Sequence, residues 1–543
     1  MNIPPKESIT VEFKSERSHA VDDSVIIDNV VAFANTRGGT LYLGVEDDGT
    51  PSGVDCHHRD VTQLAAFLFN NTVPPVQVRA DSVDVDGVRV VAIAVDESTE
   101  LTCTRSGRVL RRVLKADGEP EVITMYPYEF VSRLSSIGQY DYSDQPAPNS
   151  SLSDLDSQSR DLLRRSIART HADDQILSLA DADFDGALGL TTHRVPSGEV
   201  VPTIAGILMI GTKQALRRCL PTASATFQVL RGGSPVVDET LRLPLVVMFR
   251  RVEELLVPWN PNTEVMLGSQ HANFGDFDGN AFREAMVNAF CHRDYTIMAP
   301  VRFHLDEYGL TIANPGGFMR GVDLGNLLTV SPTPRNRRLA DILKRCGYVE
   351  RTGRGVDRII ARTVAAGRPI PSYSQSTADE VVLFLRKSAV DERFVRMIDV
   401  ATVKRGNRLS DAELIVLAAI NQFGKLGVAD VARKTSMDRE RASEALSSLV
   451  AVDVVKLHKR NTYDIVWPAS AKTHAGVNAG GLNASDDRLL GLIRDMGGIV
   501  TVSAVAERLG VSYSTAYKRL KALQITGLVQ HRGKTRNSQY YLS

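Results

Sequence analysis

Short hydrophobic runs separated by polar turns dominate the first part of the chain. Residues 10–13, 39–45 and 88–95 are rich in β-branched, aliphatic or aromatic side chains, which is typical of strands. Between the first two runs, the segment DDSVIIDNVVAFANT repeats its apolar residues at the spacing of one helical face. The pattern predicts that residues 1–142 form a compact α+β domain.

The periodicity then stops and resumes. Residues 143–156 mix Pro, Ser, Asn and Asp without any repeat, the usual composition of a linker. An α/β connecting region is predicted at 157–268. Within it, the apolar run TIAGILMIGT at 203–212 indicates a buried strand, and PLVVMFRRVEELLV at 244–257 indicates an amphipathic helix.

Residues 269–395 combine one helix with several strands. The segment REAMVNAFCHRDY at 283–295 has the apolar spacing of a helix. The segment VRFHLDEYGLTIAN at 301–314 predicts a hairpin, and EVVLFLRK at 380–387 predicts a closing strand. We expect these elements to form one α/β module.

The last part of the chain repeats one order of elements. Residues 396–467 and 485–543 each predict a helix, a short helix, a turn, a further helix and two strands around a basic turn. This order is typical of a winged helix-turn-helix. Residues 468–484 are small, polar and Gly-rich, which predicts a flexible linker.

Composition excludes several classes of protein. Lys plus Arg equals Asp plus Glu, at 64 each, so the overall charge predicts neither a nucleic-acid nor a membrane partner. The five cysteines show no C-x-x-C spacing, which argues against a disulfide framework or a zinc ribbon. No apolar run reaches the length of a membrane span and no signal peptide is apparent. We expect a cytoplasmic protein without a membrane partner, and association with the nucleoid is a further expectation.

Positive charge is concentrated at the C-terminus. From Thr501 to Ser543 there are seven Lys or Arg residues and one acid, Glu507. This balance suits phosphate contacts, and the turn before the last helix suits contacts with base edges. The predicted nucleic-acid residues are Ser512, Tyr513, Ser514, Tyr517, Lys518, Arg519, Lys521, Arg532, Lys534 and Arg536.

The unit at 396–467 mixes acids with bases and gives a weaker signal. Both C-terminal units leave a second interpretation open, in which the charges form a solvated face or contact other proteins. Both resemble the winged helices of bacterial transcription factors, the second more closely, and double-stranded DNA is the expected partner.

Polar side chains recur along the helix at 283–295. Glu284, Asn288 and His292 fall on one face, which is either a site or a solvated surface. Two Gly-rich turns follow, and such turns let backbone N–H groups approach phosphates. The turns contribute Asn314, Gly316, Gly317, Gly353, Arg354 and Gly355. The alternative is structural: His292 and the Arg-Asp pair after it only cap the helix.

These three features together resemble the GHKL ATPases, in the RecG-related branch attached to Schlafen-like regulators. The resemblance implies ATP and Mg²⁺ as cofactors, with Asn288 holding Mg²⁺ and Glu284 orienting or deprotonating the attacking water. It also implies that the turn at 353–355 covers the phosphates, and that SPTPRNRRLADIL at 331–343 forms a lid with Arg335, Asn336 and Arg337 near them. The adenine-reading Asp of the family is replaced here by Asn314. Weak ATPase activity is possible on this interpretation.

The segments ESITVEFKSE and AFANTRGGTLYLGVEDDGTPSGV resemble the Schlafen/AlbA-type nucleic-acid-binding domain. The resemblance implies that Glu7, Glu12 and Asp47 gather a divalent cation, as in nuclease-active Schlafens, and that Lys14 contacts a phosphate. The competing interpretation is that these acids are ordinary strand and turn residues. Cys56, His57, His58 and Cys103 match no zinc spacing and are taken as structural.

The sequence therefore predicts an α+β multidomain protein with a Schlafen/AlbA-type domain, a GHKL-like α/β sandwich and two winged helices. The leading hypothesis is a DNA-binding transcriptional regulator of bacterial type with a nucleotide-sensing module, which pairs as a homo-oligomer. The alternative is a metal-dependent, Schlafen-like nuclease or antiphage defence effector gated by nucleotide. A third hypothesis is an interaction scaffold.

Overall fold

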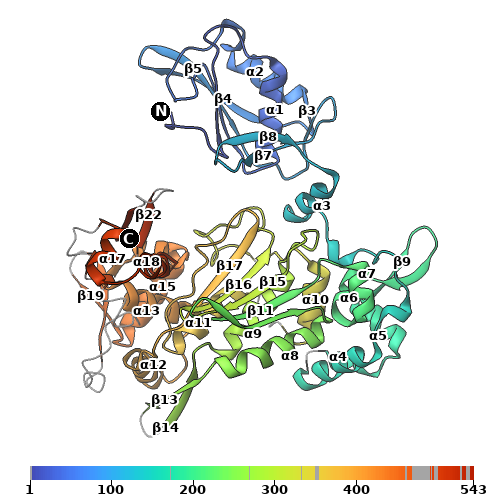
Figure 1. Ribbon diagram of the computed structural model, residues 1–543, viewed down its shortest axis with the longest axis vertical. Helices are drawn as coiled ribbons and strands as arrows, with labels where there is room; N and C mark the ends of the chain where they lie inside the picture. Colours follow the sequence, from blue (N-terminus) through green and yellow to red (C-terminus); the bar gives the residue numbers. More distant parts are fainter. Residues whose placement is uncertain are drawn as a thin grey trace. The chain divides into compact units, whose positions relative to one another are not determined.

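The computed structural model describes residues 3–171, 173–267, 270–331, 333–348, 354–458, 461–467, 489–490, 492–493, 499–525, 529–532 and 539–542. The chain divides into two compact units, residues 1–140 and 141–543. It is a mixed α+β multidomain protein, and Figure 1 traces it from the N-terminus in blue to the C-terminus in red. Among the described residues, the helices are too short or too polar to cross a membrane.

The N-terminal unit is built around a four-stranded sheet with the order β1-β2-β5-β4. β1 and β2 are parallel, whereas β5 is antiparallel to both of its neighbours. The elements of this unit are β1 (Val11–Lys14), α1 (Asp23–Ala34), β2 (Gly39–Leu43), η1 (Cys56–His58), α2 (Val61–Asn70), β3 (Thr72–Val73), β4 (Val78–Val85), β5 (Val88–Val95), β6 (Cys103–Thr104), β7 (Leu110–Leu114), β8 (Pro120–Thr124) and α3 (Pro127–Ser136). The three strands and the helix predicted from the hydrophobic pattern are confirmed.

A buried arginine, Arg112, ties the sheet of this unit to α1. Its side chain is fully buried, and Nη1 donates to Oδ1 of Asn29 at 3.2 Å. Nη2 donates to Oε2 of Glu12 at 2.7 Å and to the carbonyl of Ser8 at 2.9 Å, while the guanidinium lies 4.6 Å from the centre of the Phe33 ring. Because a buried charge needs a partner, Arg112 and Glu12 stabilise each other inside the unit.

The larger unit centres on a five-stranded sheet with the order β12-β11-β15-β16-β17. Only β11 and β15 are parallel neighbours in it. The elements around this sheet are β11 (Ala225–Arg231), β12 (Ser234–Leu241), α8 (Leu245–Leu256), η5 (Val257–Trp259), β13 (Asn262–Leu267), β14 (Gln270–Gly275), α9 (Gly279–Cys291), β15 (Val301–Leu305), β16 (Gly309–Pro315), α10 (Arg337–Arg345), α11 (Gly355–Ala365) and β17 (Glu380–Arg386). Helices α8 and α9 run along one face of the sheet (Figure 1), and their apolar residues join the sheet in one core. The two predicted helices, the hairpin and the closing strand are confirmed.

Residues 143–156 are a folded part of the larger unit, which corrects the prediction of a linker. Ala147 is fully buried in the main core, and the carbonyl of Gln145 accepts a hydrogen bond from the amide of Ile204 at 2.8 Å. The composition was misleading because Ser151 and Asp154 cap a short 3₁₀ turn and Asp156 caps the next helix. This part of the unit contains η2 (Tyr142–Asp144), η3 (Leu152–Asp154), α4 (Ser157–Thr170), η4 (Asp174–Ser178), α5 (Asp181–Leu188), β9 (Thr191–Arg194), β10 (Glu199–Pro202), α6 (Ile204–Ile210) and α7 (Lys213–Cys219).

The run TIAGILMIGT forms the helix α6, so the predicted strand is wrong. Thr203 caps this helix, because its side chain accepts a hydrogen bond from the amide of Gly206 at 2.9 Å. All seven residues of α6 are buried, so no polar face marks the helical period in the sequence. A Cβ at Gly206 would lie 2.0 Å from the carbonyl oxygen of Leu190, which shows how closely α6 approaches the preceding segment.

Two groups of elements end the chain, and both contain a strand, two helices and two further strands in that order. The first contains α12 (Glu392–Arg405), α13 (Asp411–Phe423), β18 (Leu426–Gly427), α14 (Val428–Thr435), α15 (Arg439–Ala451), β19 (Val455–His458) and β20 (Thr462–Ile465); the second contains β21 (Ile499–Thr501), α17 (Val502–Leu509), α18 (Tyr513–Ile525), β22 (Val529–Arg532) and β23 (Gln539–Leu542). Their sheets have equivalent orders, β18-β20-β19 and β21-β23-β22. Helix α12 runs across the predicted boundary after residue 395, and the predicted linker at 468–484 lies outside the described residues.

The first C-terminal group shares its hydrophobic core with the sheet-bearing module. Ile360, Ala361 and Val364 of α11 pack among the buried residues of α12, α13, α14 and α15. Leu328, from the loop between β16 and α10, belongs to the same core. Helix α11 is therefore fixed on one side to α9 and on the other side to the first C-terminal group.

A second buried arginine, Arg293, holds the segment that follows α9. Its side chain is completely buried, and Nη2 donates to the carbonyls of Thr222, at 2.6 Å, and of Ala299. The guanidinium also lies 4.7 Å from the centre of the Tyr295 ring. These contacts join the segment at 293–299 to the distant loop at Thr222.

Replacing Arg293 with Met should destabilise the larger unit by about 3 kcal/mol, because buried carbonyl groups lose their charged donor. Urea unfolding followed by the fluorescence of Trp259, which packs against the main core, measures this change in a Trp467→Phe background. The control is Arg302→Ala, which removes an exposed ion pair with Glu380 and should cost less than about 1 kcal/mol. Equal losses in the two variants would contradict the assigned role of Arg293.

Candidate functional site

A cavity of about 660 Å³ lies in the larger unit, between α9, α11, the sheet and the loop that follows β16. Cavities of this size are typical of small-molecule and cofactor sites. It brings together seven of the residues predicted from the sequence: Glu284, Asn288, His292, Asn314, Gly317, Arg354 and Gly355. These residues come from three segments that are distant in the chain: α9, the end of β16 with the turn after it, and the start of α11.

The start of α11 lies directly against the polar face of α9. A Cβ added to Gly355 would stand 2.4 Å from Oε1 of Glu284 and 2.8 Å from Nδ2 of Asn288. Any side chain at residue 355 would thus displace both groups. The glycine at this position allows the backbone of α11 to approach the carboxylate and the amide, which are one helical turn apart on α9.

The cavity wall carries charges of both signs. Arg358 lies 3.6 Å from Oε2 of Glu284, and Asp357 is paired with Arg441 of α15. The charged lining residues are Glu284, Asp341, Lys344, Arg354, Asp357, Arg358, Asp438 and Arg441. Such a lining offers both carboxylate oxygens and guanidinium donors to one ligand.

His292 ends α9 and is neutral at physiological pH. Burial, with a further contribution from the charge of Arg335, lowers the pKa of His292 to about 4. The residue occupies the C-cap position, so it lies at the end of the helix rather than within its polar stripe. A neutral imidazole can accept or donate one hydrogen bond in the cavity, but it offers no charge to a phosphate.

Asn314 offers an unused donor to the cavity. The residue lies in β16 and is 5 % exposed, and its Nδ2 has no hydrogen-bond partner among the described residues. Buried amide groups rarely stay unpaired in folded proteins. The arrangement is therefore suited to a ligand that supplies an acceptor at this point.

Several predicted site residues have structural roles. Gly316 is absent from the cavity lining; it has a φ of +94° and packs against Asp294, which favours glycine for backbone reasons. Arg335 and Asn336 were expected near the phosphates, but both are buried. Nε of Arg335 donates to the carbonyl of His292 at 3.2 Å, and Nδ2 of Asn336 donates to the carbonyl of Cys291 at 2.9 Å.

The Arg335 and Asn336 side chains therefore fix the end of α9 instead of forming a lid. Arg337 begins α10. Gly353 lies outside the described residues. Ser331, Thr333 and Pro334 from the same predicted lid do line the cavity.

Sequence reasoning missed Asp357, Arg358 and Arg441. The first two follow Gly355 within one turn of α11, so the helical period could have indicated them. Arg441 had no such signal, because it lies in the first C-terminal group, far along the chain from the rest of the cavity.

The three N-terminal acids, Glu7, Glu12 and Asp47, interact electrostatically. Burial raises the pKa of Glu7, and the charges of Glu12 and Asp47 add to this effect. Glu12 is bonded through Oε1 to Lys14 and through Oε2 to Arg112, so both of its oxygens already have cationic partners. Lys14, predicted to contact a phosphate, is held by Glu12 and by the carbonyl of Phe13.

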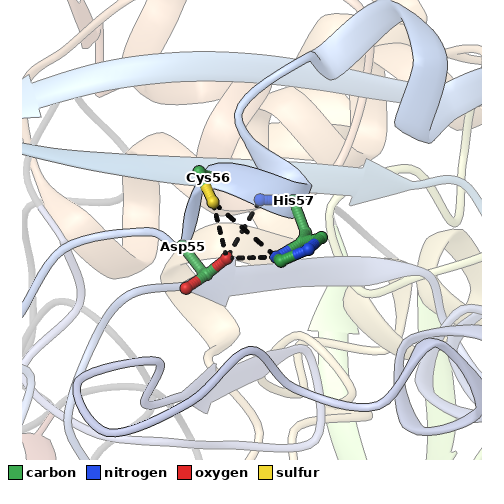
Figure 2. A group of neighbouring side chains, drawn as sticks. All are labelled: Asp55, Cys56 and His57. Atoms are coloured by element: carbon green, nitrogen blue, oxygen red, sulfur yellow. Dashed lines mark hydrogen bonds and ion pairs between the residues drawn. The ribbon is translucent and has the colours of Figure 1, made fainter.

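Among the described residues, the only candidate metal-binding trio is Asp55, Cys56 and His57. Figure 2 shows their side chains around one oxygen of Asp55, which lies 2.6 Å from Nδ1 of His57 and 3.4 Å from Sγ of Cys56. The backbone amide of His57 also donates to this oxygen, and these bonds lower the pKa of Asp55 to about 2. The trio is explained by the capping of η1, and His58 points elsewhere, to Glu16 at 2.5 Å.

The predicted nucleic-acid residues fall mostly on α18. Tyr513, Tyr517 and Lys521 are spaced by four residues, so they share one face of the helix, and all three are exposed. Ser512 precedes the helix and accepts a hydrogen bond from the amide of Thr515 at 3.2 Å. Lys518 is exposed and Arg519 is partly exposed, Ser514 is exposed in the first turn, and Arg532 ends β22. Lys534 and Arg536 lie outside the described residues.

Comparison with protein families identifies three regions of the chain. Residues 7–119 match the Schlafen, AlbA_2 family, and residues 301–385 match the HATPase_c_4 family, which is named for the C-terminal region of a recG ATP-dependent DNA helicase. Residues 133–226 match a domain of unknown function, DUF8451. The first two matches indicate a function related to nucleic acids and are consistent with nucleotide and Mg²⁺ binding. The second covers β15 to β17, whereas α9 with Glu284 and Asn288 precedes it.

Several solved structures resemble the chain, and one of them does so over most of its length. The DIP2311 protein from Corynebacterium diphtheriae is 22% identical, with a TM-score of 0.51, and the match covers 84% of this chain and 92% of that chain. At this identity the likeness concerns the fold alone.

The low pKa of His292 predicts a pH-dependent stability. Between its ordinary value of about 6.5 and the folded value of about 4, the unfolded chain binds a proton that the folded chain excludes. The stabilising effect of a neutral His292 is present above pH 6.5 and is lost as the pH falls. Lowering the pH from 7 to 5 should therefore destabilise the wild type by about 2 kcal/mol more than His292→Gln. Urea unfolding at the two pH values measures the difference, and equal pH dependence in both proteins would contradict the assignment.

Proposed function

We propose that this protein is a DNA-binding regulator that senses a nucleotide through a GHKL-like module and binds double-stranded DNA through C-terminal winged helices. One observation carries the proposal: residues predicted separately from three motifs meet in a single cavity. If the polar face of α9 were only a solvated surface, the two distant turns would not be expected to line a cavity with it.

The cavity suits a nucleotide bound with Mg²⁺. Asn288 presents an oxygen atom, which Mg²⁺ prefers, and the start of α11 adds backbone N–H groups and Arg354 for phosphates. Asn314 provides an unpaired amide donor for a purine ring. When bound, Mg²⁺ would neutralise phosphate charge. Glu284 would then orient or deprotonate a water molecule, which makes weak hydrolysis a secondary activity of the same site.

The C-terminal groups suit DNA. In each group, a helix, a turn and a further helix are followed by a two-stranded wing. In the second group, the exposed face of Tyr513, Tyr517 and Lys521 places aromatic and cationic side chains side by side, and Lys521 lies 5.7 Å from the centre of the Tyr517 ring. A homo-oligomer would pair two such helices on two half-sites.

The nuclease alternative has weaker support from the geometry. Glu7, Glu12 and Asp47 influence one another electrostatically, but Glu12 has a cation on each oxygen. A metal ion would have to displace Arg112 or Lys14 from Glu12. We therefore assign the N-terminal unit a role in nucleic-acid binding rather than in cleavage.

The first test of the nucleotide site is isothermal titration of the full chain with ATP and Mg²⁺. Wild type should bind, and Asn288→Ala should weaken binding by about 10- to 100-fold, because a charge-assisted contact is lost. Glu284→Gln should retain binding, since its proposed role is in catalysis.

The matched control for this titration is Asn280→Ala, which removes an exposed amide from the same helix outside the cavity. Absence of binding by wild type would refute the nucleotide-sensing function. Equal affinities for wild type and Asn288→Ala would refute the role of Asn288.

The test of DNA binding is its dependence on salt. Replacing Lys518, Arg519 and Lys521 together with Ala should reduce the slope of log affinity against log salt by about 3, as three phosphate contacts disappear. Fluorescence anisotropy with a random-sequence duplex measures this slope.

A triple Ala variant at the exposed residues Lys213, Arg217 and Arg242 removes the same charge elsewhere and should keep the wild-type slope. Equal slopes in all three proteins would exclude α18 as the DNA contact. Cleavage of the duplex by wild type in Mn²⁺, and not by Glu7→Gln, would restore the nuclease alternative.

A further inference from the structure

The loop between β16 and α10 is attached to the first C-terminal group. The hydroxyl of Ser436, after α14, donates to the carbonyl of Leu324, and Nη1 of Arg441 donates to the carbonyl of Leu328 at 3.0 Å. The side chain of Leu328 is buried in the core of that group and also lines the cavity. Thus the cavity wall formed by this loop is held by Ser436, which follows α14, and by Arg441 of α15.

Arg441 extends from α15 into the same cavity. Its Nη2 donates to Oδ2 of Asp357 in the first turn of α11, and its Nη1 donates to the carbonyl of Leu328. A guanidinium has five N–H donors, so further donors remain for a ligand. The residue lies 84 positions after Asp357 in the sequence, yet both line the cavity beside Arg354 and Arg358.

We propose that Arg441 binds the phosphate chain of the nucleotide and thereby couples nucleotide binding to the arrangement of the first C-terminal group. This inference rests on the proposed nucleotide-sensing function. It names the residue through which nucleotide binding would affect the first C-terminal group. Arg441 is a ligand-binding residue here, and it is supplied by α15 rather than by the nucleotide-binding module.

The transmission follows from reciprocity of binding. With a phosphate in the cavity, Arg441 would join the ligand to Asp357 and to the loop at Leu328, so the nucleotide favours the docked arrangement of α15. By linkage, the docked arrangement favours nucleotide binding by the same factor. A ligand that lacks phosphates would have no contact with Arg441, so its binding would not favour the docked arrangement of α15.

The same arrangement assigns the first C-terminal group a role different from that of the second. The N-terminal end of α15, which would approach the major groove in a DNA complex, is engaged with the loop through Ser436 and Arg441. The charges on this helix are mixed, with Arg439 followed by Glu440 and later by Glu444. In the docked arrangement this group is a regulatory contact, and the second group supplies the DNA contact.

The experiment compares three probes on the full chain: the β,γ-imido analogue of ATP with Mg²⁺, ADP with Mg²⁺, and adenosine measured by competition. Arg441→Ala should weaken binding of the triphosphate analogue by about 10- to 100-fold, because a charge-assisted contact is lost. Its affinity for adenosine should equal that of wild type. Arg441→Gln, which keeps hydrogen-bond donors but removes the charge, gives the same comparison if Arg441→Ala does not fold.

The matched control is Arg439→Ala, which removes the same charge from an exposed position at the start of the same helix. It should bind all three probes like wild type. A second readout follows the docked group directly: Trp467 packs against its core, so in a Trp259→Phe background the triphosphate analogue should change the Trp467 emission. Saturated Arg441→Ala should show no such change.

The outcomes separate the two proposals. If wild type binds none of the three probes, the nucleotide-sensing function fails and the inference fails with it. If wild type binds the triphosphate analogue and Arg441→Ala binds it equally well, the nucleotide site stands and the role of Arg441 is overturned. Selective loss for phosphate-bearing probes, together with loss of the Trp467 response, supports the role of Arg441.

Discussion

The end of α9 is fixed by two buried guanidinium groups, and the site depends on this constraint. Arg293 binds the carbonyl of Thr222 from a distant loop, and Arg335 donates to the carbonyl of His292 and lies 3.7 Å from Asp294. Burial lowers the pKa of both arginines, but neither loses its charge near neutrality, so the surrounding carbonyls must remain in place to solvate them. The two buried arginines therefore fix the position of α9, and this position places Asn288 in the cavity lining.

The second constraint is the close approach of two helices. The side chains of Glu284 and Asn288 occupy the space that a side chain at Gly355 would need, so the backbone of α11 meets the carboxylate of Glu284 directly. Helix α11 also belongs to the core of the first C-terminal group. The cavity and that group therefore share one structural element, so a change in one is transmitted to the other through packed side chains as well as through the loop at Leu328.

The sequence predicted the parts of this structure that repeat with a regular period. Glu284 and Asn288 were placed correctly because a helical spacing of four residues sets a common face. The strand predicted at 203–212 was wrong because a fully buried helix has no polar face, and 143–156 was mistaken for a linker because capping residues have the composition of loops. Arg441 was missed because tertiary packing brought it to the cavity, and no local pattern records such a contact.

The shared core also determines how the chain can be divided. A fragment that ended at residue 395, as the sequence pattern suggested, would expose Ile360, Ala361 and Val364 on the outer face of α11. Contiguous apolar surface of this kind promotes self-association. A soluble piece that retains the cavity therefore has to extend through the first C-terminal group, to about residue 467, and proteases that cut exposed chain should spare the junction near residue 395 because it lies inside α12.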